Sequence, residues 1–302
     1  MSKYWPPDKR PNNSTYKVVQ EASKPIFIGG CPRSGTSILA FLVGQHPNVL
    51  TYMEPGPFYE LFNNLVLKFR CPLWLFRTVY SVHIPEKVVY SVSKQPAATG
   101  RDASSHFAAA RIRDELRHLH SAGHWRLREE FSEFAQRLLG GFAMSCGRQR
   151  WAVKRPTYLY SHIDEIHAIH PDMKFIHVVR DGRDVIASMM RQPWARRAPT
   201  RFEYAFRIWT SEMSRGDAAA MRVPVRNLFR VRLEDLVSSE DHVRDLCEFM
   251  EEENHPAMQS YFHRQVKFGD VHSGRWRKEL SSQQIRRIEA SGGEILARHG
   301  YV

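Results

Sequence analysis

Short apolar runs alternate with segments of helical spacing along most of the chain. Four runs predict buried parallel strands: residues 24–30, 150–156, 173–179 and the first part of 227–237. The first and third runs lead into helical patterns, SILAFLVGQHP and RDGRDVIASMMRQ. This alternation predicts an α/β fold with a parallel sheet and helices on both faces. Ligands of such sheets bind at the carboxyl ends of the strands.

The stretch between the first two predicted strands has a different character. Residues 57–147 contain long amphipathic runs at helical spacing, such as HFAAARIRDELRHLH and REEFSEFAQRLLGGFAM. We interpret this segment as a mostly helical insertion and as a lid over an acceptor site. Residues 1–23, which include YWPPDKRPNNS, predict an N-terminal arm. One domain is therefore expected over residues 24–302.

The composition is that of a folded globular protein. With 302 residues, 42% of them hydrophobic, the chain can bury a sizeable core. The N-terminus lacks the apolar core of a signal peptide, and no apolar stretch reaches the roughly 18 residues that span a bilayer. We therefore expect a soluble, cytoplasmic protein. The four cysteines lie far apart and are expected to be free thiols, and no metal-binding pattern accompanies the histidines.

The net charge of +12 reflects either a solvated basic surface that keeps the protein soluble or an anionic ligand or partner. Nucleic acid is one possibility, and a small polyanion is the other. Several arginines lie within ordered-looking motifs rather than in a basic run: Arg33, Arg155, Arg180 and Arg183. The sequence contains no RNP, zinc-finger or helix-turn-helix pattern. It therefore favours a small polyanionic ligand and no nucleic-acid partner.

The stretch FIGGCPRSGTS resembles a phosphate-binding loop with one residue changed. Gly30 and Gly35 have the spacing of the signature G-x-x-x-x-G-K-[ST], and Ser37 ends it, but Thr36 occupies the lysine position. The backbone N–H groups from Ser34 onward, at the start of a predicted helix, are placed to bind one phosphate. Simple helix capping by SGTS is the alternative. This loop pattern indicates that the parallel β-sheet is P-loop-like.

Three stretches together resemble the sulfotransferases that use 3′-phosphoadenosine 5′-phosphosulfate (PAPS). CPRSGTS resembles the family's 5′-phosphosulfate loop, in which P-[KR]-S-G-T-[TS] replaces the lysine pattern. VVRDGRDVIASMMR resembles the 3′-phosphate motif, and VRLEDLV with GRWRKEL resembles the carboxyl-terminal elements. The matches span about residues 25 to 280. The resemblance implies PAPS as co-substrate, no metal ion, and a hydroxyl group as acceptor.

The pattern is most similar to the tyrosylprotein sulfotransferase type. PRSGTSILAFLVGQHPNVLTYME carries Glu54 twenty-one residues after Arg33, and KRP at 154–156 matches the type's lysine-x-proline triplet. We expect no membrane anchor before the domain, and residues 57–147 follow no pattern of that type. The acceptor therefore does not carry over: sugars, lipids, phenols, tyrosine peptides and small natural products all stay open.

The resemblance implies three catalytic side chains. Arg33 and Lys154 are expected to stabilise the charge that develops on the leaving phosphate. Glu54 is expected to be the general base for the acceptor hydroxyl, with partial burial raising its pKa. The alternatives are structural: Glu54 pairs with an arginine, Lys154 is a surface lysine, or the two pair with each other. His83 or His106 is the rival base.

The donor's 3′-phosphate is expected to lie between Arg180 and Ser188. These residues are eight positions apart, one at a strand end and one on the following helix, so that they can converge on one anion. An ion pair of Arg180 with Asp181 or Asp184 is the alternative. Arg183 and Asp184 are expected to cap and pair within the start of the helix.

The last motif and the competing functions complete the expectations. Arg275, Trp276 and Lys278 are expected to form a flap over the adenosine and the 3′-phosphate, or else RKEL only begins the last amphipathic helix. A P-loop kinase or NTPase is an alternative function, but it needs the lysine that Thr36 replaces. A non-catalytic nucleotide-binding module is another alternative. Oligomeric state is not predicted.

Overall fold

The computed structural model describes most of the chain. The described residues are 24–55, 75, 78–81, 84–85, 107–116, 127–155, 158–197, 200–266 and 273–302. The predicted arm at 1–23 lies outside them, as do Cys71 and both rival bases, His83 and His106. Much of the segment 57–147 lies outside as well, so its role as a lid stays a prediction.

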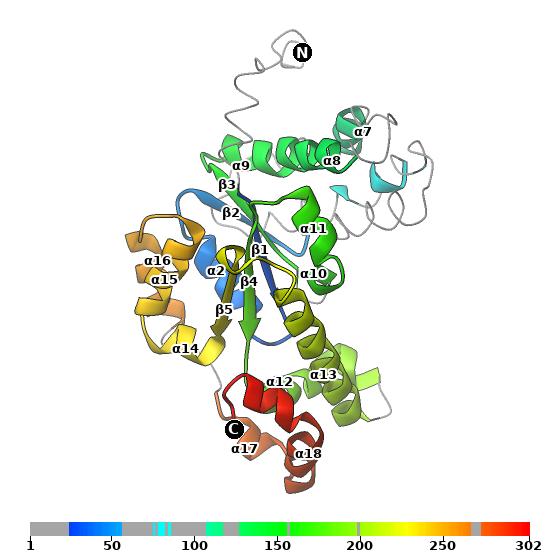
Figure 1. Ribbon diagram of the computed structural model, residues 1–302, viewed down its shortest axis with the longest axis vertical. Helices are drawn as coiled ribbons and strands as arrows, with labels where there is room; N and C mark the ends of the chain where they lie inside the picture. Colours follow the sequence, from blue (N-terminus) through cyan, green and yellow to red (C-terminus); the bar gives the residue numbers. More distant parts are fainter. Residues whose placement is uncertain are drawn as a thin grey trace.

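Five parallel strands form the sheet at the centre of the described chain (Figure 1). Their order is β2-β3-β1-β4-β5, and each pairing is parallel. The strands are β1 (Ile26–Gly30), β2 (Val49–Met53), β3 (Arg150–Lys154), β4 (Lys174–Val179) and β5 (Leu228–Arg232). All but β2 confirm strands expected from the apolar runs, and the sheet confirms the parallel α/β fold.

Strand β2 is the element that the sequence pattern missed. Its residues VLTYM are all buried, and they pair with β3 over the full length of both strands. A five-residue run with a threonine in its centre has neither strict alternation nor a distinctive length. The pairing with β3 and a hydrogen bond from Tyr52 Oη to the carbonyl oxygen of Leu139 (2.6 Å) fix its place.

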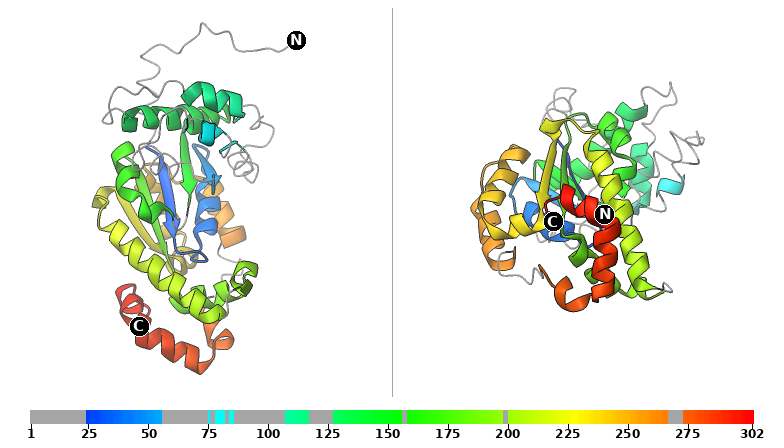
Figure 2. Two further views of the ribbon diagram at one scale, coloured as in Figure 1. Left: turned by 90° about the vertical axis from the view of Figure 1, so that its right-hand side faces the viewer. Right: turned by 60° about the horizontal axis from the view of Figure 1, so that its bottom comes forward.

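Helices cover both faces of the sheet (Figures 1 and 2). On one face lie α2 (Thr36–Val43), α14 (Leu233–Ser238), α15 (Asp241–Met250), α16 (Pro256–Tyr261) and the π-helical η6 (Phe262–Val266). On the other lie α10 (Tyr158–Ser161), α11 (Ile163–Ile169) and α13 (Arg201–Ala220), and the short η5 (Val225–Asn227) precedes β5. Each face has its own buried hydrophobic cluster, with alternate residues of β1 pointing into the two.

The described part of the predicted insertion is helical. It comprises α7 (Ala109–Leu116), α8 (Leu127–Ala135), the π-helical turn η3 (Gln136–Gly140) and α9 (Gly141–Ser145). Trp151 Nε1 of β3 donates a hydrogen bond to Gln136 Oε1 at 2.8 Å, and Phe131 and Phe134 are buried in the same cluster as Trp151. This layer therefore packs on the same hydrophobic cluster as β3, α10 and α11.

A third group of elements surrounds the hydrophobic cluster that contains Trp209. They are α12 (Gly182–Met190), η4 (Pro193–Arg197), α17 (Trp276–Glu279) and α18 (Ser282–Arg298), which lie beside α13 (Figure 1). A Cβ atom on Gly182 or Gly292 would lie 2.2 or 2.5 Å from the Trp209 ring, so only glycine permits this approach. Arg298 donates to the buried Asp217 at 2.8 Å, which ties α18 to α13.

Two expectations about composition can be checked on the described residues. Cys31 and Cys247 are buried and form no disulfide, as expected. None of the described helices is long and apolar enough to cross a membrane.

Candidate functional site

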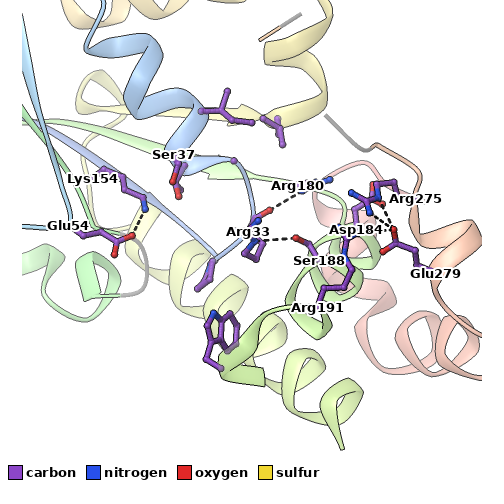
Figure 3. Close-up of a pocket in the computed structure, with 16 residues that line it drawn as sticks. Arg33, Ser37, Glu54, Lys154, Arg180, Asp184, Ser188, Arg191, Arg275 and Glu279 are labelled. Carbon is purple, nitrogen blue, oxygen red and sulfur yellow. Dashed lines mark hydrogen bonds and ion pairs between the residues drawn. The ribbon is translucent and has the colours of Figure 1, made fainter. Parts of the chain in front are cut away.

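A cavity of 760 Å³ opens at the carboxyl ends of the strands (Figure 3). Each strand brings a lining residue to it: Arg33 after β1, Glu54 after β2, Lys154 at the end of β3, Arg180 after β4 and Leu233 after β5. Helix α12 and the segment around α17 supply the rest of the charged wall: Asp184, Arg191, Arg275 and Glu279. With five basic and three acidic side chains in its wall, the cavity suits an anion.

The loop between β1 and α2 approaches its surroundings too closely for side chains at its two glycines. A Cβ on Gly30 would lie 2.5 Å from Thr36 Cγ2, and one on Gly35 would lie 2.6 Å from a leucine of α14. Gly35 also has a left-handed φ of 96°. Ser34 Oγ is buried and has no hydrogen-bond partner among the described residues, whereas Thr36 and Ser37 line the cavity. A tight loop with an orphaned polar atom fits a phosphate cradle.

Arg33 joins this loop to the end of β4. Its Nε donates to Ser188 Oγ of α12 at 3.1 Å, and its carbonyl oxygen accepts a hydrogen bond from Arg180 Nη1 at 3.0 Å. Its backbone φ is 73°, a left-handed conformation that is uncommon outside glycine. Burial, and then the nearby Arg180, lower the pKa of the Arg33 guanidinium, although an arginine still remains charged. The structure thus brings the predicted residues of both phosphate motifs together.

Glu54 and Lys154 form an ion pair on the other side of the loop (Figure 3). The Glu54 N–H donates to the Lys154 carbonyl oxygen at 2.9 Å, and the Glu54 backbone is left-handed, with φ 58°. The Lys154 side chain is 7% exposed and that of Glu54 is 52% exposed. The mutual pair that the sequence left open as an alternative is therefore present, and the carboxylate is more open to solvent than partial burial implied.

The start of α12 is held by an acidic cap. Asp181 is the N-cap residue and accepts the Arg183 backbone N–H at 2.9 Å, while the Arg183 guanidinium binds both oxygens of Asp181 at 2.8–3.2 Å. The pairing predicted within the helix start is therefore confirmed for Arg183. It occupies Asp181 and leaves Arg180, directly after β4, on the cavity wall.

Asp184 differs from the expectation that it acts within its own helix. Its two carboxylate oxygens accept the backbone N–H groups of Gly274 (2.7 Å) and Trp276 (3.0 Å), ninety or more residues away. Asp184 is 2% exposed, so these two hydrogen bonds to a charged acceptor are nearly buried. The carboxylate therefore anchors the segment that carries Arg275 against the helix that carries Ser188.

The structure separates the three residues of the predicted flap. Arg275 lines the cavity, where its Nε donates to Glu279 Oε1 at 2.7 Å. Trp276 is 9% exposed, and its ring packs against the guanidinium groups of Arg183 (4.2 Å) and Arg277 (4.5 Å). Neither Trp276 nor Lys278 belongs to the cavity wall. Their contact with a ligand therefore stays a prediction.

The sequence comparison decides the family. The model described as "Sulfotransferase family" matches residues 25–256, which includes the glycine loop, Glu54, Lys154 and Ser188. The chain belongs to the sulfotransferase family. The match concerns the family as a whole, so the closer resemblance to the tyrosylprotein type stays a prediction.

Several solved structures resemble this sulfotransferase. One is the sulfotransferase domain from the curacin biosynthetic pathway, with 15% identity and a TM-score of 0.49. The match covers 92% of this chain and 97% of that one. Sulfotransferase STF9 from Mycobacterium avium has 18% identity and a TM-score of 0.49, with coverage of 94% and 79%. The sulfotransferase domain of a Synechococcus olefin synthase has 17% identity and a TM-score of 0.48, with coverage of 96% and 98%. A comparison with curated proteins found no match.

The sulfotransferase cavity contains residues that sequence reasoning did not place there. They are Pro32, Ile38, Asp184, Arg191, Trp194, Leu233 and Glu279. Helical spacing carried a usable signal for two of them, since Asp184 and Arg191 lie four before and three after Ser188 and so share its face of α12. Glu279 similarly lies four after Arg275. The described residues hold no group of three or more His, Cys, Asp or Glu side chains suited to a metal ion.

Proposed function

We propose that this sulfotransferase moves the sulfuryl group of PAPS to the hydroxyl group of an acceptor. The observation that carries the proposal is the convergence of two anion-binding segments on one cavity. The loop after β1 lies on one side and Arg180 with Ser188 on the other, joined by the Arg33–Ser188 hydrogen bond. Two phosphates on one nucleoside match two such segments, and Thr36 leaves no lysine for a β/γ-phosphate pair.

The residues present fit the two ends of the donor. The loop offers backbone N–H groups at the start of α2, which suit the 5′-phosphate. Arg180, Ser188 and Arg275 supply guanidinium and hydroxyl donors for the 3′-phosphate. Trp276 and Lys278 belong to the segment that Asp184 anchors, and we expect them to support this flap.

Three side chains of the chain then have distinct tasks. Bound PAPS supplies an activated sulfuryl group on its 5′-phosphate. Arg33 and Lys154 present fixed positive charge beside the loop and stabilise the negative charge that builds up on the phosphate as the sulfuryl group departs. Glu54 takes the proton of the acceptor hydroxyl. The ion pair with Lys154 holds the Glu54 carboxylate through Oε1, while Oε2 has no hydrogen-bond partner among the described residues.

A binding and transfer experiment tests the proposal. Adenosine 3′,5′-bisphosphate should raise the melting temperature more than adenosine 5′-monophosphate does. Radiolabelled PAPS should label at least one acceptor in a panel of sugars, lipids, phenols and tyrosine peptides. An Arg33→Ala variant should then lose transfer by about 100- to 1,000-fold, because it lacks a charge that stabilises the transition state.

Two outcomes contradict the proposal. Robust ATP hydrolysis with Mg²⁺, without preference for the bisphosphate, would identify a P-loop NTPase. Tight binding of the bisphosphate with no labelled acceptor, and no effect of Arg33→Ala on PAPS turnover, would identify a binding module.

A further inference from the structure

A carboxylate occupies two of the arginines in the cavity wall. Glu279 Oε1 accepts a hydrogen bond from Arg275 Nε at 2.7 Å, and it forms ion pairs with Arg275 Nη2 at 2.5 Å and with Arg191 Nη1 at 3.5 Å (Figure 3). Arg191 ends α12, whereas Arg275 and Glu279 flank α17, so the contact joins two separate walls. All three residues line the cavity. An acidic side chain thus contacts two of the five basic side chains in the cavity wall.

Helix stability does not account for this ion pair. Arg275 is the N-cap and Glu279 the last residue of α17, which has only four residues. The order places a cation at the helix N-terminus and an anion at its C-terminus, opposite to the favourable orientation. Exposed i,i+4 pairs contribute little even in the favourable order. The contact therefore needs an explanation from the cavity.

The chemistry of the contact is that of a bound phosphate. Arginine binds carboxylate and phosphate oxygens through the same fork of N–H donors. Without Glu279, two guanidinium groups would face the same part of the cavity with their charges uncompensated. A phosphate group carries up to two negative charges near neutral pH, whereas the carboxylate carries one. It therefore attracts the arginine pair more strongly than Glu279 does.

We propose that Glu279 is an internal competitor for the donor's 3′-phosphate: it holds Arg275 and Arg191 until a 3′-phosphorylated nucleotide binds and displaces it. This inference rests on the proposed function. The competition lowers the affinity for the spent donor, adenosine 3′,5′-bisphosphate, because the carboxylate reclaims the arginines as that product leaves. Glu279 thereby favours product release and keeps smaller anions off the arginine pair.

The test is a comparison of two nucleotides by isothermal titration calorimetry at one salt concentration. Glu279→Gln should tighten the binding of adenosine 3′,5′-bisphosphate about fivefold, the size expected for removal of a competing ion pair. The affinity for adenosine 5′-monophosphate should change by less than about twofold, because that ligand leaves Arg275 and Glu279 together. Glu279→Ala, which also removes the acceptor oxygen, should show the same direction.

Glu294→Gln is the matched control for charge. Glu294 is exposed on α18 and is no part of the cavity wall, so this variant should leave both affinities unchanged. Melting curves of all variants check that the fold is retained. Weaker or unchanged bisphosphate binding in both Glu279 variants overturns the competitor role, because weakening would mean that Glu279 positions Arg275 for the ligand. If the unaltered chain shows no preference for the bisphosphate over the monophosphate, the proposed donor site itself fails, and the competitor role with it.

Discussion

The two ends of strand β3 carry the same kind of residue for different purposes. Arg150 begins the strand and Lys154 ends it, and each is 6% exposed. The Arg150 guanidinium donates to the carbonyl oxygens of Lys24 (2.6 and 3.1 Å) and Met250, and to Glu252 at 3.0 Å. The Lys154 ammonium pairs instead with the half-exposed Glu54, and this end of the strand opens on the cavity. Burial and positive charge alone therefore do not identify a ligand-binding residue. The distinguishing property is that the ammonium group of Lys154 can still bind a ligand, whereas each nitrogen of the Arg150 guanidinium already donates to a protein oxygen.

Backbone strain shows the same contrast. Among the described residues, three that are not glycine have positive φ: Arg33, Glu54 and Glu251. Glu251 ends α15 in a left-handed cap, with Glu252 N–H bonded to the Cys247 carbonyl oxygen, which is a usual way to end a helix. Arg33 and Glu54 follow strands and face the cavity. Left-handed backbone at such positions costs roughly 1–3 kcal/mol each, and it is concentrated where we place the chemistry.

Arg150→Ala should destabilise the fold at the amino end of β3, the end away from the cavity. The substitution leaves the Glu252 carboxylate, whose side chain is 8% exposed, without its buried cation. Loss of one partner of a buried ion pair costs about 3–5 kcal/mol of the free energy of unfolding. Urea denaturation measures this loss. The transfer rate per folded molecule should stay unchanged. A large drop in that rate would contradict the assignment of stability to the Arg150 end of β3 and of chemistry to the Lys154 end.

Lys154→Met should instead reduce activity, because it changes the end of β3 that faces the cavity. We expect the transfer rate, measured with the acceptor that the screen identifies, to fall about 100- to 1,000-fold, because a fixed charge beside the leaving phosphate is lost. The free energy of unfolding should change by less than about 1 kcal/mol, since only a half-exposed ion pair is removed.

Lys174→Met is the matched control for Lys154→Met. Lys174 begins β4, is 7% exposed and pairs with Glu251 at 2.8 Å, at the end of the sheet away from the cavity. This variant should retain the transfer rate. Equal losses of activity in both variants would mean that a buried lysine matters to the fold wherever it lies, and not to the chemistry.

Local pattern was enough to predict most of the fold. The runs that became β1, β3, β4 and β5 each contain a short apolar stretch, and the turn residues after β1 and β4 predicted the starts of α2 and α12. Strand β2 was not predicted because its conformation depends on pairing with β3, from Val49↔Arg150 to Met53↔Lys154, which lie 101 residues apart in sequence. Strand propensity is decided by such partners, and no local pattern reports them.

The same distinction applies to the site. Arg33, Glu54, Lys154 and Arg180 could be expected at one cavity, because the ends of parallel strands meet at one edge of the sheet. Asp184 could not, since its partners are backbone N–H groups ninety or more residues later. The competition of Glu279 for arginines from two walls is similarly a property of the folded chain. Side chains placed by strand ends are predictable, and those placed by helix-to-loop docking are not.

Acidification should lower the free energy of unfolding by a small and measurable amount, through the ion pairs of Glu251 at the end of the sheet away from the cavity. Hydrogen bonds from Lys174 and then Lys24 lower the pKa of Glu251 to about 2, from an ordinary value of 4.5. Because the folded-state pKa lies below the unfolded one, the carboxylate stabilises the fold above about pH 4.5 and loses this contribution as the pH falls toward 2. The Glu251 side chain is 48% exposed, so solvent screening limits the contribution to under about 1 kcal/mol. Unfolding free energies of the unaltered chain and Glu251→Gln should therefore differ at pH 7, and the difference should shrink below pH 4.5 and disappear near pH 2. If the difference does not change with pH, the substitution acts through packing at the end of α15. The charge of Glu251 would then not stabilise this end of the sheet.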